Sequence, residues 1–301
     1  MTSKFFCVVN TPALPTPYTH HFTTNKFASG FEHLGFEKRE IENVEELESV
    51  PDTETTILMV SNHGVEGNWD VNRLRPLERF TKATKLLWHF HSYLLAGAEV
   101  PFNNWILTGE HMHMPPNLPA HKKAYDFHNT LPNYEPLTFS SYLNPQVVGK
   151  LARGPMKWDA QFVGSPYKTE WTSQLPNSFI RPIALSTSEE ERVASFLQSH
   201  CALGFHSPEN VANNVVVERV PEALSGAVCL TDSPAAVVHT NNCAVLVSSL
   251  QDLKEKIAYY KQDTVAAEKK RQEGYEWVRQ KGTYSHVAQR FLDRIEQLGY
   301  C

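Results

Sequence analysis

The sequence predicts an α/β protein of two domains, each built around parallel strands. Short apolar runs in the first half end in polar or histidine-rich loops, which is typical of parallel sheets that bind ligands at their carboxyl edge. In the second half, strands and helices alternate with short loops, as in a doubly wound sheet. Proline and glycine cluster over residues 144–155. We therefore expect one domain over 1–148 and a second over 149–301.

The elements of the first domain follow from its apolar runs. A first helix is expected over Lys26–Leu34. The runs that predict strands are Phe5–Val9, Thr56–Val60, Leu86–His91, Trp105–Thr108 and Leu137–Tyr142.

In the second domain, the predicted strands and helices alternate more regularly. A helix is expected to start over Tyr167–Gln174, and another over Ser188–His200 has three glutamates in its first turn, which suits the helix dipole. The tail reads as helices over Leu250–Tyr260 and Thr264–Leu298, with a break at Gly282. The expected strands are Ala160–Val163, Phe179–Leu185, Ala202–Phe205, Val228–Thr231 and Ala244–Val247.

Composition excludes several classes of protein. Of the 301 residues, 41% are hydrophobic and 20% charged, as in a soluble globular protein. The formal net charge of −5 gives no general attraction to polyanions, so nucleic acid is not an expected partner. No apolar run approaches the ~20 residues of a transmembrane segment, and the N-terminal apolar run is too short for a signal peptide. The five scattered cysteines indicate buried free thiols in a reducing compartment, so we expect a cytoplasmic protein.

The stretch Asn213–Asp232 carries the most specific chemistry. It is expected to form a loop, a short helix with Arg219 and Glu222 one turn apart, a Ser-Gly turn at Ser225, and a strand ending in Thr-Asp. A helix that opens near the carboxyl end of a parallel strand attracts phosphate through its free N–H groups and dipole. An arginine at i and a glutamate at i+3 project from the same face. The pair suits a phosphate and a sugar diol.

Three segments together resemble a known family. Arg219–Ala227 reads Arg-Val-Pro-Glu-Ala-Leu-Ser-Gly-Ala, Asp159–Ser165 reads as a strand and a turn, and Thr283–Arg290 reads as a closing helix. They resemble the nucleotide-binding half of the group 1 glycosyltransferases, in the branch with an Arg-x-x-Glu-Ala helix. The resemblance implies the GT-B arrangement, in which two Rossmann-like domains face a cleft, and final helices that cross back to the first domain.

The resemblance implies roles for the helix residues. Glu222 would bind the ribose hydroxyls of a nucleotide-sugar, and Arg219 would lie beside its diphosphate or nucleotide. Backbone N–H groups of Asn213 to Val216, which include Asn214 and Val215, would contact phosphate without a metal if they open the helix. Many relatives carry a glutamate where this chain has Asn214, which puts a carboxylate role at the sugar hydroxyls in doubt. The alternative is that Arg219 and Glu222 form an ordinary i,i+3 ion pair.

Other candidates for the donor site follow two strands. Gly164 and Ser165 form a turn after the strand Ala160–Val163, and Lys168 near the next helix start would meet the donor diphosphate. The alternative for Lys168 is a solvated side chain. His206 follows the strand Ala202–Phe205 and either touches the donor or is an exposed loop histidine.

The first domain offers candidate bases. His63 directly follows a buried strand, and its imidazole suits deprotonation of an acceptor hydroxyl. Glu66 and Asp70 are rival bases, and each of the three could instead be structural or contact only the acceptor.

Motif absences bear on cofactors. The chain has neither the Gly-x-Gly-x-x-Gly fingerprint of dinucleotide binding nor a Gly-Lys-Ser/Thr phosphate loop. No Asp-x-Asp metal motif is found, so we expect a metal-independent enzyme without a cofactor. The His-x-His pairs at His89 and His111 resemble parts of a calcineurin-like metal site, but the first strand supplies no aspartates.

These observations predict a glycosyltransferase. It would move a sugar from a nucleoside diphosphate sugar, bound by the second domain, to a glycan or other hydroxyl acceptor bound by the first. Two alternatives remain open: a non-catalytic nucleotide- or glycan-binding module of the same fold, and a metal-dependent hydrolase that uses the paired histidines.

Overall fold

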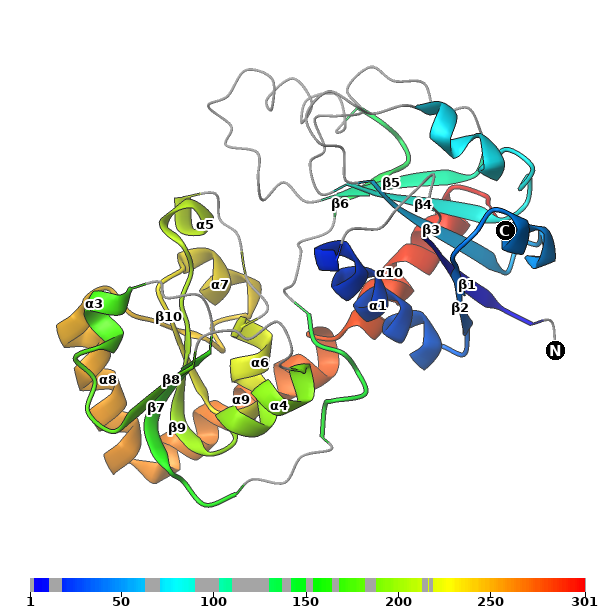
Figure 1. The fold of residues 1–301 in the computed structure, drawn as a ribbon. Coiled ribbons are helices and arrows are strands. Elements are labelled where there is room, and N and C mark those ends of the chain that lie inside the picture. The colour runs from blue at the N-terminus through cyan, green and yellow to red at the C-terminus, as the bar shows by residue number, and fades with distance from the viewer. Residues whose placement is uncertain are drawn as a thin grey trace. The chain divides into compact units, whose positions relative to one another are not determined.

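The chain contains two parallel α/β sheets, each in its own compact unit (Figure 1). The computed structural model describes residues 3–10, 18–62, 71–89, 103–109, 130–136, 142–149, 154–163, 168–181, 188–212, 216 and 219–300. One unit consists of residues 1–138 and 284–301, and the other of residues 139–283. The expected α/β fold with two Rossmann-like sheets is therefore confirmed.

The first sheet has six parallel strands in the order β2-β1-β3-β4-β5-β6. Four of the expected strands are present, and the fifth, Leu137–Tyr142, falls almost wholly outside the described residues. The sequence did not predict β2 or β6. The strands are β1 (Phe5–Val9), β2 (Glu37–Ile41), β3 (Thr56–Asn62), β4 (Thr84–His89), β5 (Trp105–Gly109) and β6 (Tyr134–Pro136).

Aromatic packing covers one face of the first sheet. Helix α1 (Tyr18–His33) and helix α10 (Tyr284–Gln297) lie there together. The Phe27 ring contacts both Tyr284 and Phe291, with ring centroids 5.6 Å apart in each case. The other face packs against the 3₁₀ helices η1 (Glu45–Ser49) and η2 (Val71–Leu77) through an apolar cluster.

The second sheet has five parallel strands in the order β11-β10-β9-β7-β8. The strands are β7 (Trp158–Val163), β8 (Ser178–Arg181), β9 (Ser199–Gly204), β10 (Val228–Thr231) and β11 (Val245–Leu246). The helices are α3 (Thr169–Thr172), α4 (Glu189–Phe196), α5 (Pro208–Ala212), α6 (Arg219–Gly226), α7 (Pro234–His239), α8 (Leu250–Gln262) and α9 (Thr264–Lys281). Apolar side chains of α4, α6 and α9 pack on one face, and those of α8 on the other.

Several element boundaries differ from the expected ones. Helix α1 begins at Tyr18, before the expected start at Lys26. The predicted helix Ser188–His200 ends at Phe196, and Ser199 begins β9 instead. The predicted Ser-Gly turn belongs to α6, which continues through Gly226. A Cβ at Gly226 would lie 3.1 Å from the backbone nitrogen of Leu197, so this glycine lets α6 approach α4 closely.

The unit boundary also differs from the expected division at 148/149. Leu143 and Val147 belong to the apolar cluster of the second sheet, so the second unit begins earlier. By that division the helix after Gly282 falls in the second domain, but α10 belongs to the first unit because its aromatic face packs on α1. The predicted break at Gly282 is present, since α9 ends at Lys281.

The thiols are free where the structure describes them. Cys7, Cys201 and Cys229 are buried, and Cys243 is partly buried, as expected. Burial raises the pKa of Cys7 and of Cys229 to about 12. None of the described helices combines the length and apolar character that a bilayer crossing requires.

Candidate functional site

A pocket of about 580 Å³ with several charged lining residues lies where three adjacent strands of the second sheet end. Lys168 follows β7, His206 follows β9 and Asp232 follows β10 directly. Because these strands are parallel and adjacent, their carboxyl ends meet at one edge and bring the three side chains together. The remaining lining comes from Glu170, Pro208, Val211 and Ala212.

Asp232 is the centre of this group. Its Oδ1 accepts a hydrogen bond from the backbone N–H of His206 at 3.0 Å, and the His206 Nδ1 atom lies 3.0 Å from the same oxygen. Asp232 Oδ2 lies 3.5 Å from the Lys168 Nζ atom. The carboxylate therefore joins the two residues that the sequence predicted for the donor site.

Lys168 adopts an uncommon backbone conformation. Its φ of 52° lies in the left-handed region, which a non-glycine residue occupies at a cost in free energy. The Lys168 Nζ atom also lies 4.3 Å from the centre of the Trp171 ring. The side chain is 28% exposed, so its ammonium group is accessible to a ligand in the pocket.

Glu222 is held by two arginines. Arg192 of α4 donates from Nη2 to Glu222 Oε1 at 2.7 Å and from Nε to both carboxylate oxygens at 3.1 Å. Arg219 donates from Nη1 to Oε2 at 2.6 Å. The Glu222 side chain is fully buried. The i,i+3 ion pair that the sequence left as an alternative is therefore present, with Arg192 as an additional partner.

Four of the candidate site residues are described, and they form two groups. Lys168 and His206 line the pocket at the sheet edge, whereas Arg219 and Glu222 lie in the buried cluster with Arg192. Helix α6 begins at Arg219, so the residue that opens it is not Asn214 or Val215. The candidates outside the described residues are His63, Glu66, Asp70, Gly164, Ser165, Asn214 and Val215.

Two residues of this region were not predicted as site residues. Asp232 follows a strand in the same way as His206, and that position is a usable signal. Arg192 lies among glutamates near a helix start, where a surface ion pair is the usual expectation, and only the fold brings it to Glu222.

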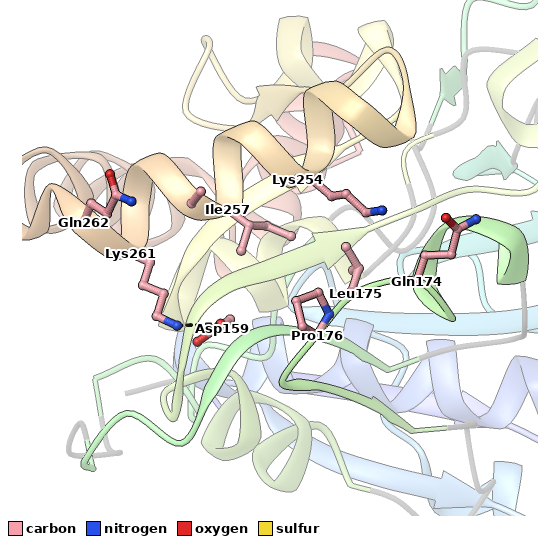
Figure 2. Close-up of a pocket in the computed structure, with 9 residues that line it drawn as sticks. Asp159, Gln174, Leu175, Pro176, Lys254, Ile257, Lys261 and Gln262 are labelled. Atoms are coloured by element: carbon pink, nitrogen blue, oxygen red, sulfur yellow. Dashed lines mark hydrogen bonds and ion pairs between the residues drawn. The ribbon is translucent and has the colours of Figure 1, made fainter.

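A larger pocket of about 660 Å³ lies at the other end of β7 (Figure 2). Its polar wall includes Lys261 of α8, which forms an ion pair with Asp159 at 2.8 Å. Asp159 is the second residue of β7, whereas Lys168 follows the end of that strand. This pocket therefore lies at the amino edge of the sheet, away from the group around Asp232.

The described ranges hold no cluster of three or more histidine, cysteine, aspartate or glutamate side chains with the geometry of a metal site. His63, His91, His111 and His113 lie outside these ranges, and the side chain of His89 is not described. The paired histidines of the hydrolase alternative therefore lie outside the side chains that the structure describes.

The profile of the glycosyl transferase-like family matches residues 146–293. The match covers the second unit from residue 146 onward and the start of α10, and we refer to residues 146–283 as the glycosyltransferase-family domain. The matched residues include the pocket at the sheet edge, the Arg192–Glu222–Arg219 cluster and the three segments that carried the sequence resemblance. No curated protein matches the chain in sequence.

Solved structures with the same architecture include several glycosyltransferases. An α-glucosyltransferase in complex with UDP has a TM-score of 0.69 at 11% identity, over 98% of this chain and 100% of that one. The α-glucosyltransferase with UDP and a 13-mer DNA containing an HMU base has a TM-score of 0.63 at 10% identity, over 98% and 100%. A structure described as trehalose-6-phosphate from E. coli bound with UDP-2-fluoro glucose has a TM-score of 0.51 at 9% identity, over 98% and 99%. At these identities the likeness establishes the fold that the glycosyltransferase-family domain and the first unit share with such proteins.

Proposed function

We propose that the chain is a glycosyltransferase that moves a sugar from a nucleoside diphosphate sugar to an acceptor hydroxyl without a metal ion. The observation that carries the proposal is the position of Lys168 and His206 together at the carboxyl edge of the glycosyltransferase-family domain. In open α/β sheets this edge is where nucleotides bind.

In this proposal Lys168 stabilises the leaving diphosphate. Negative charge grows on the diphosphate as the glycosidic bond breaks, and a fixed cation beside it lowers the barrier. Arg219 would add to this charge stabilisation. His206 would contact the donor from the neighbouring strand end.

Glu222 can bind a ribose hydroxyl only if it gives up one of its present hydrogen bonds. Both carboxylate oxygens accept hydrogen bonds from arginines, and the side chain is fully buried. A ribose hydroxyl therefore has to replace one arginine hydrogen bond. In the described geometry Arg219 donates to Glu222 from Nη1, whereas Arg192 donates from both Nε and Nη2. We expect Arg219 to be the partner that moves.

The proposed donor is a UDP-sugar. Three solved structures of the same fold are described with UDP or UDP-2-fluoro glucose. The proposed acceptor is a glycan or another hydroxyl compound, bound by the first unit, with the acceptor base among His63, Glu66 and Asp70. One of the similar α-glucosyltransferase structures holds DNA, so a hydroxymethylated DNA belongs in the acceptor panel.

The first experiment measures the thermal stability of the purified chain with uridine, guanosine and adenosine diphosphates, and then turnover of the corresponding nucleotide-sugars. A ligand bound only by the folded state raises the unfolding temperature. Stabilisation by one diphosphate together with turnover supports the proposal. Saturable binding without turnover favours the non-catalytic module, and tightly bound stoichiometric metal favours the hydrolase.

Two variants then test the site itself. Lys168→Met is expected to lower turnover at least ~10-fold, since it removes one charge-assisted contact to the diphosphate. Lys261→Met removes a lysine at the opposite edge of the same sheet and is its matched control. Glu222→Gln keeps the side-chain volume and is preferable to Glu222→Ala, which leaves two arginines without their buried partner. Unchanged turnover in both Lys168→Met and Glu222→Gln would contradict the proposed donor site.

A further inference from the structure

The two oxygens of the Asp232 carboxylate are not equivalent. Oδ1 accepts a hydrogen bond from the His206 backbone and lies beside the His206 ring. Oδ2 is buried and accepts no hydrogen bond within the described part of the chain. Its nearest charged partner, Lys168 Nζ, is 3.5 Å away, beyond the 2.7–2.9 Å typical of a charge-assisted hydrogen bond.

A buried carboxylate oxygen without a hydrogen bond costs free energy and calls for an explanation. The Asp232 side chain is only 4% exposed, yet it lines the pocket at the carboxyl edge of the sheet. A hydroxyl group that enters this pocket would supply the missing donor.

We propose that Asp232 Oδ2 accepts a hydrogen bond from a sugar hydroxyl of the donor, and so contributes to donor specificity. This inference rests on the proposed function, because it takes the pocket at the sheet edge as the donor site. The pocket volume of about 580 Å³ lies within the range of small-molecule sites.

Lys168 makes this contact compatible with a diphosphate. Its ammonium group lies 3.5 Å from Oδ2 and partly offsets the negative charge of the carboxylate. When a diphosphate enters, the partly exposed lysine can turn to it, which uncovers Oδ2 for the hydroxyl. The lysine then lies between two anionic groups and offsets their repulsion.

Asp232 is better placed for this contact than Glu222. The Glu222 oxygens already accept four hydrogen bonds from two arginines, and no part of that side chain is exposed. A hydroxyl satisfies an unpaired oxygen at Asp232, whereas at Glu222 it has to displace an existing partner.

The test measures, by titration calorimetry, how much a single hydroxyl contributes to binding in the native chain and in Asp232→Asn. The ligands are UDP with its 2′-deoxy and 3′-deoxy analogues, and UDP-glucose with its monodeoxyglucose analogues. In the native chain, loss of the contacted hydroxyl is expected to weaken binding about 10- to 100-fold, as for a hydrogen bond to a charged group. In Asp232→Asn the same deletion is expected to weaken binding less than about 3-fold.

The two ligand series identify the source of the hydroxyl. A difference between the native chain and the variant within the UDP series assigns the contact to ribose. A difference only within the UDP-glucose series assigns it to the transferred sugar. Asp159→Asn is the matched control, because it removes another lysine-paired carboxylate of the same sheet at its opposite edge. Its deoxy series is expected to match that of the native chain.

Equal deoxy effects in the native chain and in Asp232→Asn would overturn the assignment and leave the proposed function standing. If Asp232→Asn does not fold, the native chain alone decides. The assignment is overturned when every deoxy analogue binds the native chain within about 3-fold of its parent ligand. Absence of any nucleotide or nucleotide-sugar binding by the native chain overturns the proposed function as well, and this result precedes any variant.

Discussion

Arg192 and Glu222 form a multi-point buried ion pair between two helices of the glycosyltransferase-family domain, across 30 positions of the sequence. The Arg192 side chain is 3% exposed and Glu222 is fully buried. Two buried charges are tolerated in this place because each satisfies the other with directed hydrogen bonds. The pair therefore fixes α4 to α6 as well as the position of the Glu222 carboxylate.

Removal of one partner leaves the other charge buried without its main compensation. We expect Arg192→Met to lower the free energy of unfolding by about 3–5 kcal/mol, measured by urea denaturation of the full chain. The matched control is Arg279→Met, which removes an exposed arginine from an i,i+3 pair with Glu276 and should leave the denaturation midpoint nearly unchanged. Equal effects of the two substitutions would show that the buried pair contributes no special stability.

Much of the fold was predictable because apolar β-branched runs mark strands directly. The runs that became β1, β3, β5, β7 and β10 gave those strands within about two residues. Strand β2 was missed because its sequence Glu-Lys-Arg-Glu-Ile is charged, as an edge strand of a sheet can be. The start of β9 was missed because Ser199 and His200 carry no apolar signal of their own.

The site was predictable only in part, because its decisive contacts join distant segments. The sequence placed Lys168 and His206 at strand ends, and the parallel register brings them together. Asp232 has the same strand-end position that marked His206, but the sequence alone does not give the strand order that joins it to them. Nothing in the sequence indicates that Arg192 of α4 reaches Glu222, because that contact depends on the packing of helices. The roles proposed for Arg219 and Glu222 in donor binding stay predictions.

The close approach of α1 and α10 predicts that Gly30 cannot be replaced by alanine without loss of stability. A Cβ at Gly30 would lie 2.6 Å from the carbonyl carbon of Tyr284, which is backbone and cannot rotate away. We expect Gly30→Ala to lower the free energy of unfolding by about 1–3 kcal/mol, as for an overpacked core, and to speed proteolytic release of α10. Urea denaturation and limited proteolysis measure the two effects.

Gly154→Ala is the control for the Gly30 substitution. Its Cβ would meet only the Cγ atom of Gln198, at 3.8 Å, an ordinary van der Waals distance. We expect this variant to unfold at the same urea concentration as the native chain. A stable Gly30→Ala variant with an intact C-terminal helix would mean that α10 can shift on α1 at little cost.

Lys85 of β4 predicts a dependence of stability on pH. Its side chain is fully buried, and burial lowers the pKa of this lysine from 10.5 to about 8, against the opposing effect of Asp52. The unfolded chain therefore binds more protons than the folded chain between about pH 8 and 10.5. In this window Lys85 makes the free energy of unfolding rise with pH. Below pH 8 the lysine is charged in both states, and the folded chain bears the full cost of burying its ammonium group.

The measurement compares Lys85→Met with the native chain by urea denaturation from pH 7 to 10.5, so that other titrating groups cancel. Methionine carries no ammonium group, so at pH 7 this substitution removes the penalty of burying a charge and raises the free energy of unfolding relative to the native chain. We expect this advantage of the variant to shrink by about 3 kcal/mol as the pH rises through the window. At high pH the variant still lacks the hydrogen bond that Lys85 Nζ donates to the Phe80 carbonyl. Lys82→Met removes an exposed lysine three positions earlier and serves as the charge control. A difference between Lys85→Met and the native chain that stays constant from pH 7 to 10.5 would mean that Lys85 titrates alike in the folded and unfolded chains.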